Sequence, residues 1–190
     1  MNENKLLHSH GDLSGTDVMI DYLDDTLRRL TRDLDSVDEV CLHWKIDAEA
    51  NSIALILWHM GRLMDVFFHQ LALGKPPEET CWFQCSWAEE TGYDPRGLGR
   101  DGWGTLNEYT HEEVSNIPDF TKVQVMGYIQ DVYTALRKHI KSSSMSELAQ
   151  PSLGFDGKFT RYQVISMALM DNVRHLGEIR LIQSLWERSQ

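Results

Sequence analysis

Apolar residues recur at three- and four-residue steps in four long stretches of the chain, and this spacing is typical of amphipathic α-helices. The first stretch covers residues 16–37, and its predicted inward positions are Met19, Tyr22, Thr26, Leu30, Leu34 and Val37. The other three stretches cover about 51–74, 121–142 and 160–186. No segment shows the convincing pattern of a β-strand. The pattern therefore predicts an all-α fold.

Residues at the ends of these stretches support the predicted helix boundaries. Asn51 and Ser52 are good N-caps for the second helix, and Gly74 is a typical C-terminal residue. Thr121 and Thr160 each precede a glutamine by three residues. This spacing fits a capping box, so we expect the third and fourth helices to begin at these two threonines.

A long connection, residues 75–120, joins the second and third predicted helices. It is rich in glycine and also contains three tryptophans, Trp82, Trp87 and Trp103. Disordered segments are poor in aromatic residues, so we expect this crossover, although irregular, to pack over one end of the helices. A segment from Thr110 to Glu113 is expected to begin a short helix within it. Four helices with one long crossover predict a four-helix bundle, and a length of 190 residues predicts a single domain, 1–190.

The composition is that of a soluble acidic protein and excludes some partners. The chain has 18 Lys and Arg against 29 Asp and Glu, a formal net charge of −11. Nucleic-acid binding depends largely on basic side chains that neutralise phosphates, so a nucleic-acid partner is not expected. An anionic membrane surface is disfavoured for the same reason. A small-molecule substrate remains the expected partner.

Cysteine usage and hydropathy predict a cytoplasmic location. Three cysteines do not form a disulfide framework, and the spacing of Cys81 and Cys85 is not that of a Cys-x-x-Cys site, so we expect them to serve packing. Residues 1–11 lack the apolar segment of a signal peptide. The most apolar stretch, 53–73, is too polar for a membrane span, because it contains His59, Arg62, Asp65 and His69.

Two polar residues of the fourth helix occupy its predicted apolar face. Asp171 and His175 are four residues apart, so their side chains lie one turn apart on the same face. His59 holds an inward position on the second helix. Burying a carboxylate is costly unless it is paired or binds a metal, and facing helices of a bundle bring such groups together. Two imidazoles and one carboxylate suit Zn, Ni, Fe or Mn and leave a coordination position open for water or substrate.

The same residues also have a purely structural interpretation. His59 alone is more typical of a hydrogen-bonded core histidine. Asp171 and His175 alone fit a local hydrogen-bonded pair equally well. The three residues together, in phase on two helices, favour the metal-site hypothesis over these alternatives.

Two short segments resemble the DinB/YfiT-like superfamily, whose members include metal-dependent enzymes. Residues 51–61, which include Trp58-His59, are similar to the second helix of that family. Residues 171–179 resemble its late His-x-Gly-Gln-Ile signature. With the helix order, the resemblance covers most of the chain, except for the crossover 75–120.

This resemblance implies a four-helix bundle, often a homodimer, with a metal held by one histidine of the second helix and two ligands of the last long helix. The corresponding positions here are His59, Asp171 and His175. The commonest family pattern has histidine at position 171, whereas the related mycothiol-dependent maleylpyruvate isomerases have a carboxylate, glutamate, there. Glu178 replaces the usual glutamine and is expected to support the ligands from outside the coordination sphere.

The function implied by the resemblance is that of a metal-dependent transferase, isomerase or hydrolase. Some relatives use a low-molecular-weight thiol such as mycothiol, bacillithiol or glutathione. An open metal position lowers the pKa of a thiol or water and prepares it to attack an electrophile. The alternative is a non-catalytic dimeric bundle, with a structural metal or none, that binds a partner or a small molecule.

Overall fold

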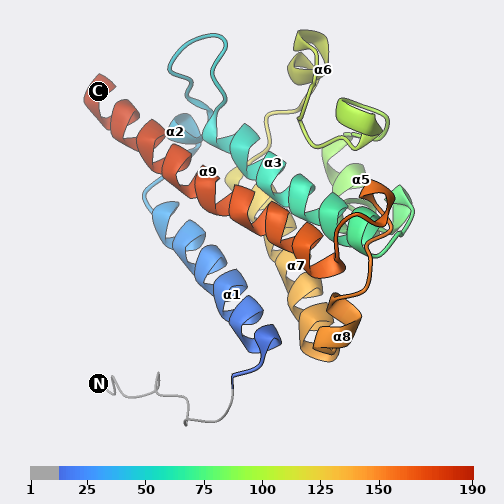
Figure 1. Ribbon diagram of the computed structural model, residues 1–190. Coiled ribbons are helices and arrows are strands. Elements are labelled where there is room, and N and C mark those ends of the chain that lie inside the picture. Colours follow the sequence, from blue (N-terminus) through green and yellow to red (C-terminus); the bar gives the residue numbers. More distant parts are fainter. Residues whose placement is uncertain (1–12) are drawn as a thin grey trace, which may run out of the picture.

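The computed structural model describes residues 13–190, which form the predicted four-helix bundle (Figure 1). In the described part of the chain there is no β-strand, only an isolated bridge between Pro151 and Thr160. The second long helix, α3, continues without a break into a π-helical segment, η1. The long elements are α1 (Gly15–Asp33), α3 (Ile53–Asp65) with η1 (Val66–Ala72), α7 (Lys122–Ser142) and α9 (Arg161–Ser189).

Short helices occupy much of the connecting chain, including the crossover that was expected to be irregular. The crossover from 75 to 120 leaves η1 and reaches α7 through several single turns (Figure 1). The short elements are α2 (Glu39–His43), η2 (Pro77–Glu79), α4 (Cys81–Gln84), α5 (Trp87–Thr91), η3 (Arg100–Gly102), α6 (His111–Ser115), α8 (Met145–Leu148) and η4 (Phe155–Gly157). Runs this short lack the repeated apolar spacing from which a helix is predicted.

The predicted caps set the helix boundaries. Thr121, Thr160 and Thr110 each form a complete capping box at the start of α7, α9 and α6. The Ser52 side chain accepts a hydrogen bond from the amide of Leu55 and begins α3. Such caps satisfy amides that have no partner within the helix, which explains why local sequence fixes these ends well.

Helix α3 lies at the centre of the bundle, and all of its residues are buried. It packs against α7 on one side and α9 on another, while α1 covers both of those helices. At Gly61 a Cβ atom would lie 2.8 Å from the Tyr128 ring, so the missing side chain permits the close approach of α3 and α7. On α1 the predicted inward position of Tyr22 is wrong: Tyr22 is 64% exposed, and the neighbouring Leu23 is buried instead.

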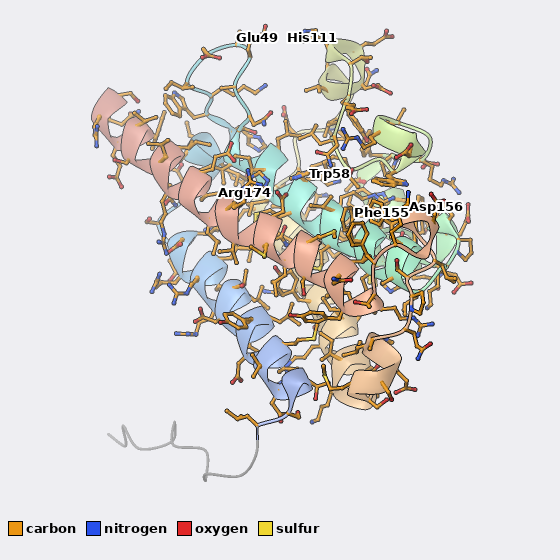
Figure 2. All side chains as sticks on the ribbon, in the orientation of Figure 1. Glu49, Trp58, His111, Phe155, Asp156 and Arg174 are labelled. Atoms are coloured by element: carbon orange, nitrogen blue, oxygen red, sulfur yellow. The ribbon has the colours of Figure 1, made fainter. Side chains whose placement is uncertain are left out.

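The crossover is anchored by aromatic packing around Trp58 of α3, as the tryptophan content suggested. The Trp58 ring lies 5.6 Å from Tyr93 and 6.0 Å from Phe120, measured between ring centroids. Trp82 and Tyr109 contact the same indole at 6.3 Å. Figure 2 shows Trp58 inside the molecule, between the bundle and the crossover. Ring pairs of this kind each add about 0.5–1.5 kcal/mol beyond their buried area, so the crossover is a packed part of the structure.

Among the described residues, no helix combines the length and the apolar character needed to cross a membrane. The segment 1–11, which contributed to the expectation of a cytoplasmic location, lies outside the described residues.

Candidate metal centre

The three predicted ligands lie together between α3 and α9. His59 projects from α3, and Asp171 and His175 project from successive turns of α9. The Asp171 Oδ2 atom is 3.3 Å from His59 Nε2 and 3.2 Å from His175 Nε2. One donor atom from each residue can be chosen so that all three lie within 4.8 Å of one another. The folded chain thus brings two imidazoles and one carboxylate to a single point.

The other nitrogen of each imidazole already has a hydrogen-bond partner. His59 Nδ1 lies 2.5 Å from the carbonyl oxygen of Thr105, and His175 Nδ1 lies 2.7 Å from Glu178 Oε2. In the metal-free protein each Nε2 donates to Asp171. An acceptor at Nδ1 keeps a proton there when a metal takes the place of the Nε2 proton, so each histidine could then offer its Nε2 lone pair. Metal-binding histidines in proteins almost always have such a partner. The arrangement therefore fits a divalent transition metal, and Glu178 is hydrogen-bonded to one of the candidate ligands.

The charges within the site favour an ionised carboxylate. The hydrogen bonds from His175 and His59 lower the pKa of Asp171 despite its partial burial. The hydrogen bond to Asp171 raises the pKa of His175, and burial opposes this shift. Asp171 is therefore negatively charged at neutral pH, as a metal ligand must be.

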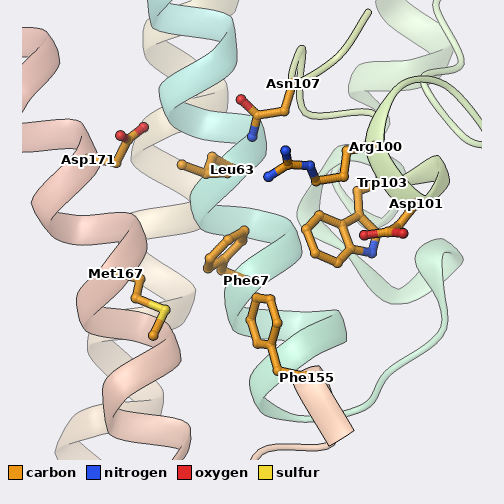
Figure 3. Close-up of a pocket in the computed structure, with 9 residues that line it drawn as sticks. All are labelled: Leu63, Phe67, Arg100, Asp101, Trp103, Asn107, Phe155, Met167 and Asp171. Carbon is orange, nitrogen blue, oxygen red and sulfur yellow. The ribbon is translucent and has the colours of Figure 1, made fainter. Parts of the chain in front are cut away.

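Two cavities meet at this site. One has a volume of about 560 Å³ and is lined by five apolar and four polar or charged side chains, with Asp171 at one end (Figure 3). The other has a volume of about 450 Å³ and includes His59, His175 and Asp171 in its wall. Asp171 and Asn107 line both cavities. A reacting group can therefore reach Asp171 from either cavity, and the two imidazoles from the smaller one.

The predicted depth of the α9 residues needs a correction. His59 is buried as expected, with 7% of its side chain exposed, but Asp171 and His175 lie at the margin of the core, with 27% and 21% exposed. The fully buried polar residue of α9 is Asn172, which donates hydrogen bonds to the carbonyl of Met60 and to the Tyr133 hydroxyl oxygen. Sequence reasoning missed Asn172, although it lies four residues after Ala168 and four before Leu176, which are both buried.

A second cluster of potential ligands, Asp65, His69 and Cys81, lies at the other end of the second helix. His69 had no identifiable partner in the sequence, but its Nδ1 atom lies 2.7 Å from Asp65 Oδ1. The amide of Cys81 donates to the same oxygen. The amide of Trp82 and the Tyr128 hydroxyl donate to Oδ2 at 3.0 and 2.8 Å. Asp65 therefore joins the bundle to the start of the crossover.

Hydrogen bonding leaves this second cluster without a free carboxylate position for a metal. A carboxylate has about four lone-pair sites, and four donors occupy those of Asp65. The Arg62 guanidinium, 3.6 Å from Oδ2, supplies the counter-charge. Burial raises the pKa of the Cys81 thiol. Cys81 is buried, as the packing interpretation predicts, whereas Cys85 is exposed.

A comparison with family models finds a match to the one described as DinB superfamily over residues 22–179. The chain belongs to the DinB superfamily. The matched range includes His59, Asp171, His175 and Glu178, and it also spans the crossover that the sequence resemblance had left out. The DinB fold and the resemblance stated from the two short segments are thereby confirmed.

A solved structure described as the conserved protein of locus from Enterococcus faecalis has a similar fold. It superposes with a TM-score of 0.72 at 16% sequence identity, covering 92% of this chain and 98% of the other. At this identity the likeness supports the DinB-type bundle alone. A comparison with curated proteins finds no significant match.

Proposed function

We propose that this DinB protein is a metal-dependent enzyme whose divalent transition metal, Zn, Ni, Fe or Mn, is held by His59, Asp171 and His175. The proposal rests on the arrangement of the metal-binding atoms and their hydrogen bonds. Two Nε2 atoms and a carboxylate converge, and both Nδ1 atoms are already engaged by Thr105 and Glu178. A hydrogen-bonded core histidine needs no such convergence.

The two cavities support a reaction with two reactants. A divalent metal at this position supplies Lewis acidity that lowers the pKa of a thiol or water. We therefore propose thiol-dependent transfer or isomerisation, in which a low-molecular-weight thiol and an electrophile enter from the two sides. Asn107 lines both cavities and is placed to hydrogen-bond either reactant. Glu178 and Thr105 hold the imidazoles in orientation while the reactants exchange.

Metal analysis of the purified protein tests the ligand set. Protein prepared without chelator, or offered each of the four metals, is expected to hold one ion per chain. His59→Ala and His175→Ala are expected to lose the ion while their helical circular dichroism persists. His43→Ala is the matched control, because His43 belongs to neither cluster and lies in a partly exposed position. Failure of the wild-type protein to hold or take up any metal would overturn the proposal.

Turnover separates the enzyme from the non-catalytic alternative. The metal-loaded protein is expected to convert an electrophile in the presence of glutathione, mycothiol or bacillithiol, and to lose this activity when the metal is removed. A metal that stabilises the fold but supports no turnover across these thiols would favour a structural role in a bundle that binds a partner or small molecule.

We also propose that the protein is a homodimer. Large apolar side chains remain exposed on the neighbouring helices α1 and α9, namely Val18, Tyr22, Met170, Val173 and Leu181. Exposed apolar surface of this kind is common at interfaces between subunits. Sedimentation equilibrium is expected to give twice the chain mass, and Met170→Glu with Val173→Glu is expected to give the monomer mass. A wild-type monomer would contradict this proposal.

A further inference from the structure

The larger of the two cavities has walls from four separate parts of the chain. Phe67 comes from η1, Trp103 from the crossover, Phe155 from η4 and Met167 from α9 (Figure 3). Its volume of about 560 Å³ lies within the range of small-molecule sites in proteins. Figure 3 shows Met167 and Asp171 on one side and Trp103 on the other, with Phe67 and Phe155 between them.

The three aromatic rings pack edge to face against one another. The Phe67 centroid is 6.0 Å from both Trp103 and Phe155, and Trp103 and Phe155 are 5.8 Å apart. The angles between the ring planes run from 65° to 83°. All three rings are only partly buried, although they pack against the core. An edge-to-face set with free ring surface is suited to receiving a further aromatic ring, and the Met167 thioether makes favourable contacts with such rings.

Strained backbone is concentrated around the cavities. Within residues 13–190, six non-glycine residues have positive φ, and four of them line one cavity or the other: Asp101, Leu106, Glu108 and Phe155. Such a backbone conformation is unfavourable for a residue with a side chain and persists only when its surroundings enforce it. Phe155, with φ of 54°, follows Gly154, whose amide is bound to the carbonyl of Leu71. An unfavourable backbone conformation at Phe155 thus accompanies the packing of its ring against Phe67 and Trp103.

Charged side chains also line this cavity, namely Arg100, Asp101 and Asp171. Arg100 is paired with Glu108, and in Figure 3 its guanidinium group lies between Asn107 and Trp103. Asp171 and Asn107 form the polar end that is shared with the second cavity. The aromatic wall itself carries no charged side chain. An occupant is therefore expected to place an uncharged ring among the aromatic residues and its polar end toward Asp171 and Asn107.

We propose that this cavity is the subsite for the aromatic part of the substrate, an uncharged ring of phenyl to naphthyl size. The orientation of the substrate, with its reacting end at Asp171, rests on the proposed function. Binding of the ring rests only on Phe67, Trp103, Phe155 and Met167, so it is expected in metal-free protein as well.

Calorimetric titration with 2-naphthylmethanol tests the subsite. The saturated analogue decahydro-2-naphthylmethanol is the matched probe, because it keeps the shape and hydroxyl group but lacks the aromatic rings. The wild-type protein is expected to bind the aromatic probe several-fold more tightly than the saturated one. Phe155→Ala is expected to weaken the aromatic probe about five- to tenfold, in line with the worth of an aromatic pair plus buried area.

Two further variants control for folding and position. Met167→Ala changes a side chain that is 36% exposed, so it keeps the fold and is expected to weaken the probe about threefold. Phe83→Ala removes a partly buried phenylalanine of the crossover that lines neither cavity, and it is expected to leave binding unchanged. Equal binding of the two probes, or equal effects of Phe155→Ala and Phe83→Ala, would overturn the proposal.

Metal content measured on the same samples separates this inference from the proposed function. Probe binding that depends on Phe155 in a protein that takes up no metal supports the subsite and overturns the metal-dependent enzyme. Metal uptake that depends on His59 and His175, without Phe155-dependent binding of the probe, supports the metal site and overturns the aromatic subsite.

Discussion

The second helix and the last helix each carry an aspartate followed four residues later by a histidine, Asp65 with His69 and Asp171 with His175. In both pairs the two side chains meet, at 2.7 Å and 3.2 Å. Asp65 is fully buried and saturated by four hydrogen-bond donors. Asp171 is 27% exposed, faces a second histidine and lines two cavities.

This difference shows what the spacing alone decides. Four residues along a helix bring the carboxylate to the imidazole in both places. The surroundings then determine whether the carboxylate retains capacity for another ligand. The lone pairs of Asp65 are occupied by hydrogen-bond donors, two of them from the crossover, and the pair stabilises the fold. Asp171 keeps the capacity to bind another ligand and lines both cavities.

The largest expected effect is on stability and belongs to the buried pair. Asp65→Ala leaves Arg62 buried without its counter-charge and two crossover amides without an acceptor. The free energy of unfolding is expected to fall by about 3–5 kcal/mol in urea denaturation of metal-free protein. Asp171→Ala is the matched control and is expected to cost less than about 1 kcal/mol, as for exposed ion pairs. Similar losses for the two variants would remove the distinction between the pairs.

Acid is expected to weaken the buried pair next. Burial alone would raise the pKa of Asp65, but the hydrogen bond with His69 and the charge of Arg62 hold it below its ordinary value of 3.8. A carboxyl group whose pKa is lowered in the folded state contributes stability above its unfolded pKa, and this contribution is lost as the pH falls through the folded pKa. The free energy of unfolding, measured by urea denaturation at several pH values, is therefore expected to fall between about pH 5 and pH 3. The fall is expected to be about 1 kcal/mol larger for the wild type than for Asp65→Asn. Parallel declines would contradict this assignment.

A smaller effect, on metal affinity, is expected at Glu178, which contacts His175 but is not one of the three proposed ligands. Glu178→Gln keeps an acceptor for His175 Nδ1 but removes the negative charge. Metal affinity, measured by competition with a chromogenic chelator, is expected to fall about tenfold without loss of helicity. Glu187→Gln, the same change at an exposed position of α9, serves as the control. Equal affinities for the two variants would show that Glu178 does not support the site.

The last prediction is that removing the buried thiol of Cys81 has no effect on metal binding. Cys81→Ala is expected to leave metal stoichiometry unchanged, because its neighbour Asp65 has no free lone pair. The cobalt(II)-loaded wild type is likewise expected to lack a thiolate charge-transfer band. Such a band, lost in Cys81→Ala, would place a metal at the buried pair instead.

Most of the fold was predictable because its signals are local. Capping boxes at Thr121 and Thr160 involve residues three apart, and helical spacing is set within a few turns. The same periodicity erred by one residue at Tyr22, where the buried position is Leu23. A repeat of three to four residues locates the apolar face of a helix, but it does not decide between adjacent positions at the edge of that face.

The candidate metal centre was predictable where two helices carry polar residues in phase, and less so in depth. His59, Asp171 and His175 do converge, but the greater burial of Asn172 depends on how α9 is rotated against α3 and α7. The four-residue spacing of Asp65 and His69 was visible in the same way. The structural role of this pair was not predictable, because Cys81, Trp82 and Tyr128 contact Asp65 only in the folded protein.

Three consecutive carbonyls of the crossover are fixed to α3. Those of Trp103 and Gly104 accept hydrogen bonds from Arg62, and that of Thr105 is bound to His59. This clamp divides the crossover into two loops, with Arg100 and Asp101 before it at the larger cavity and Leu106 and Val114 after it at the smaller one. The two loops are still joined to each other, because Arg100 pairs with Glu108 and the Arg100 amide donates to the carbonyl of Asn107. An engineer would therefore exchange the two loops together, and the clamp would keep the imidazole of His59 in place.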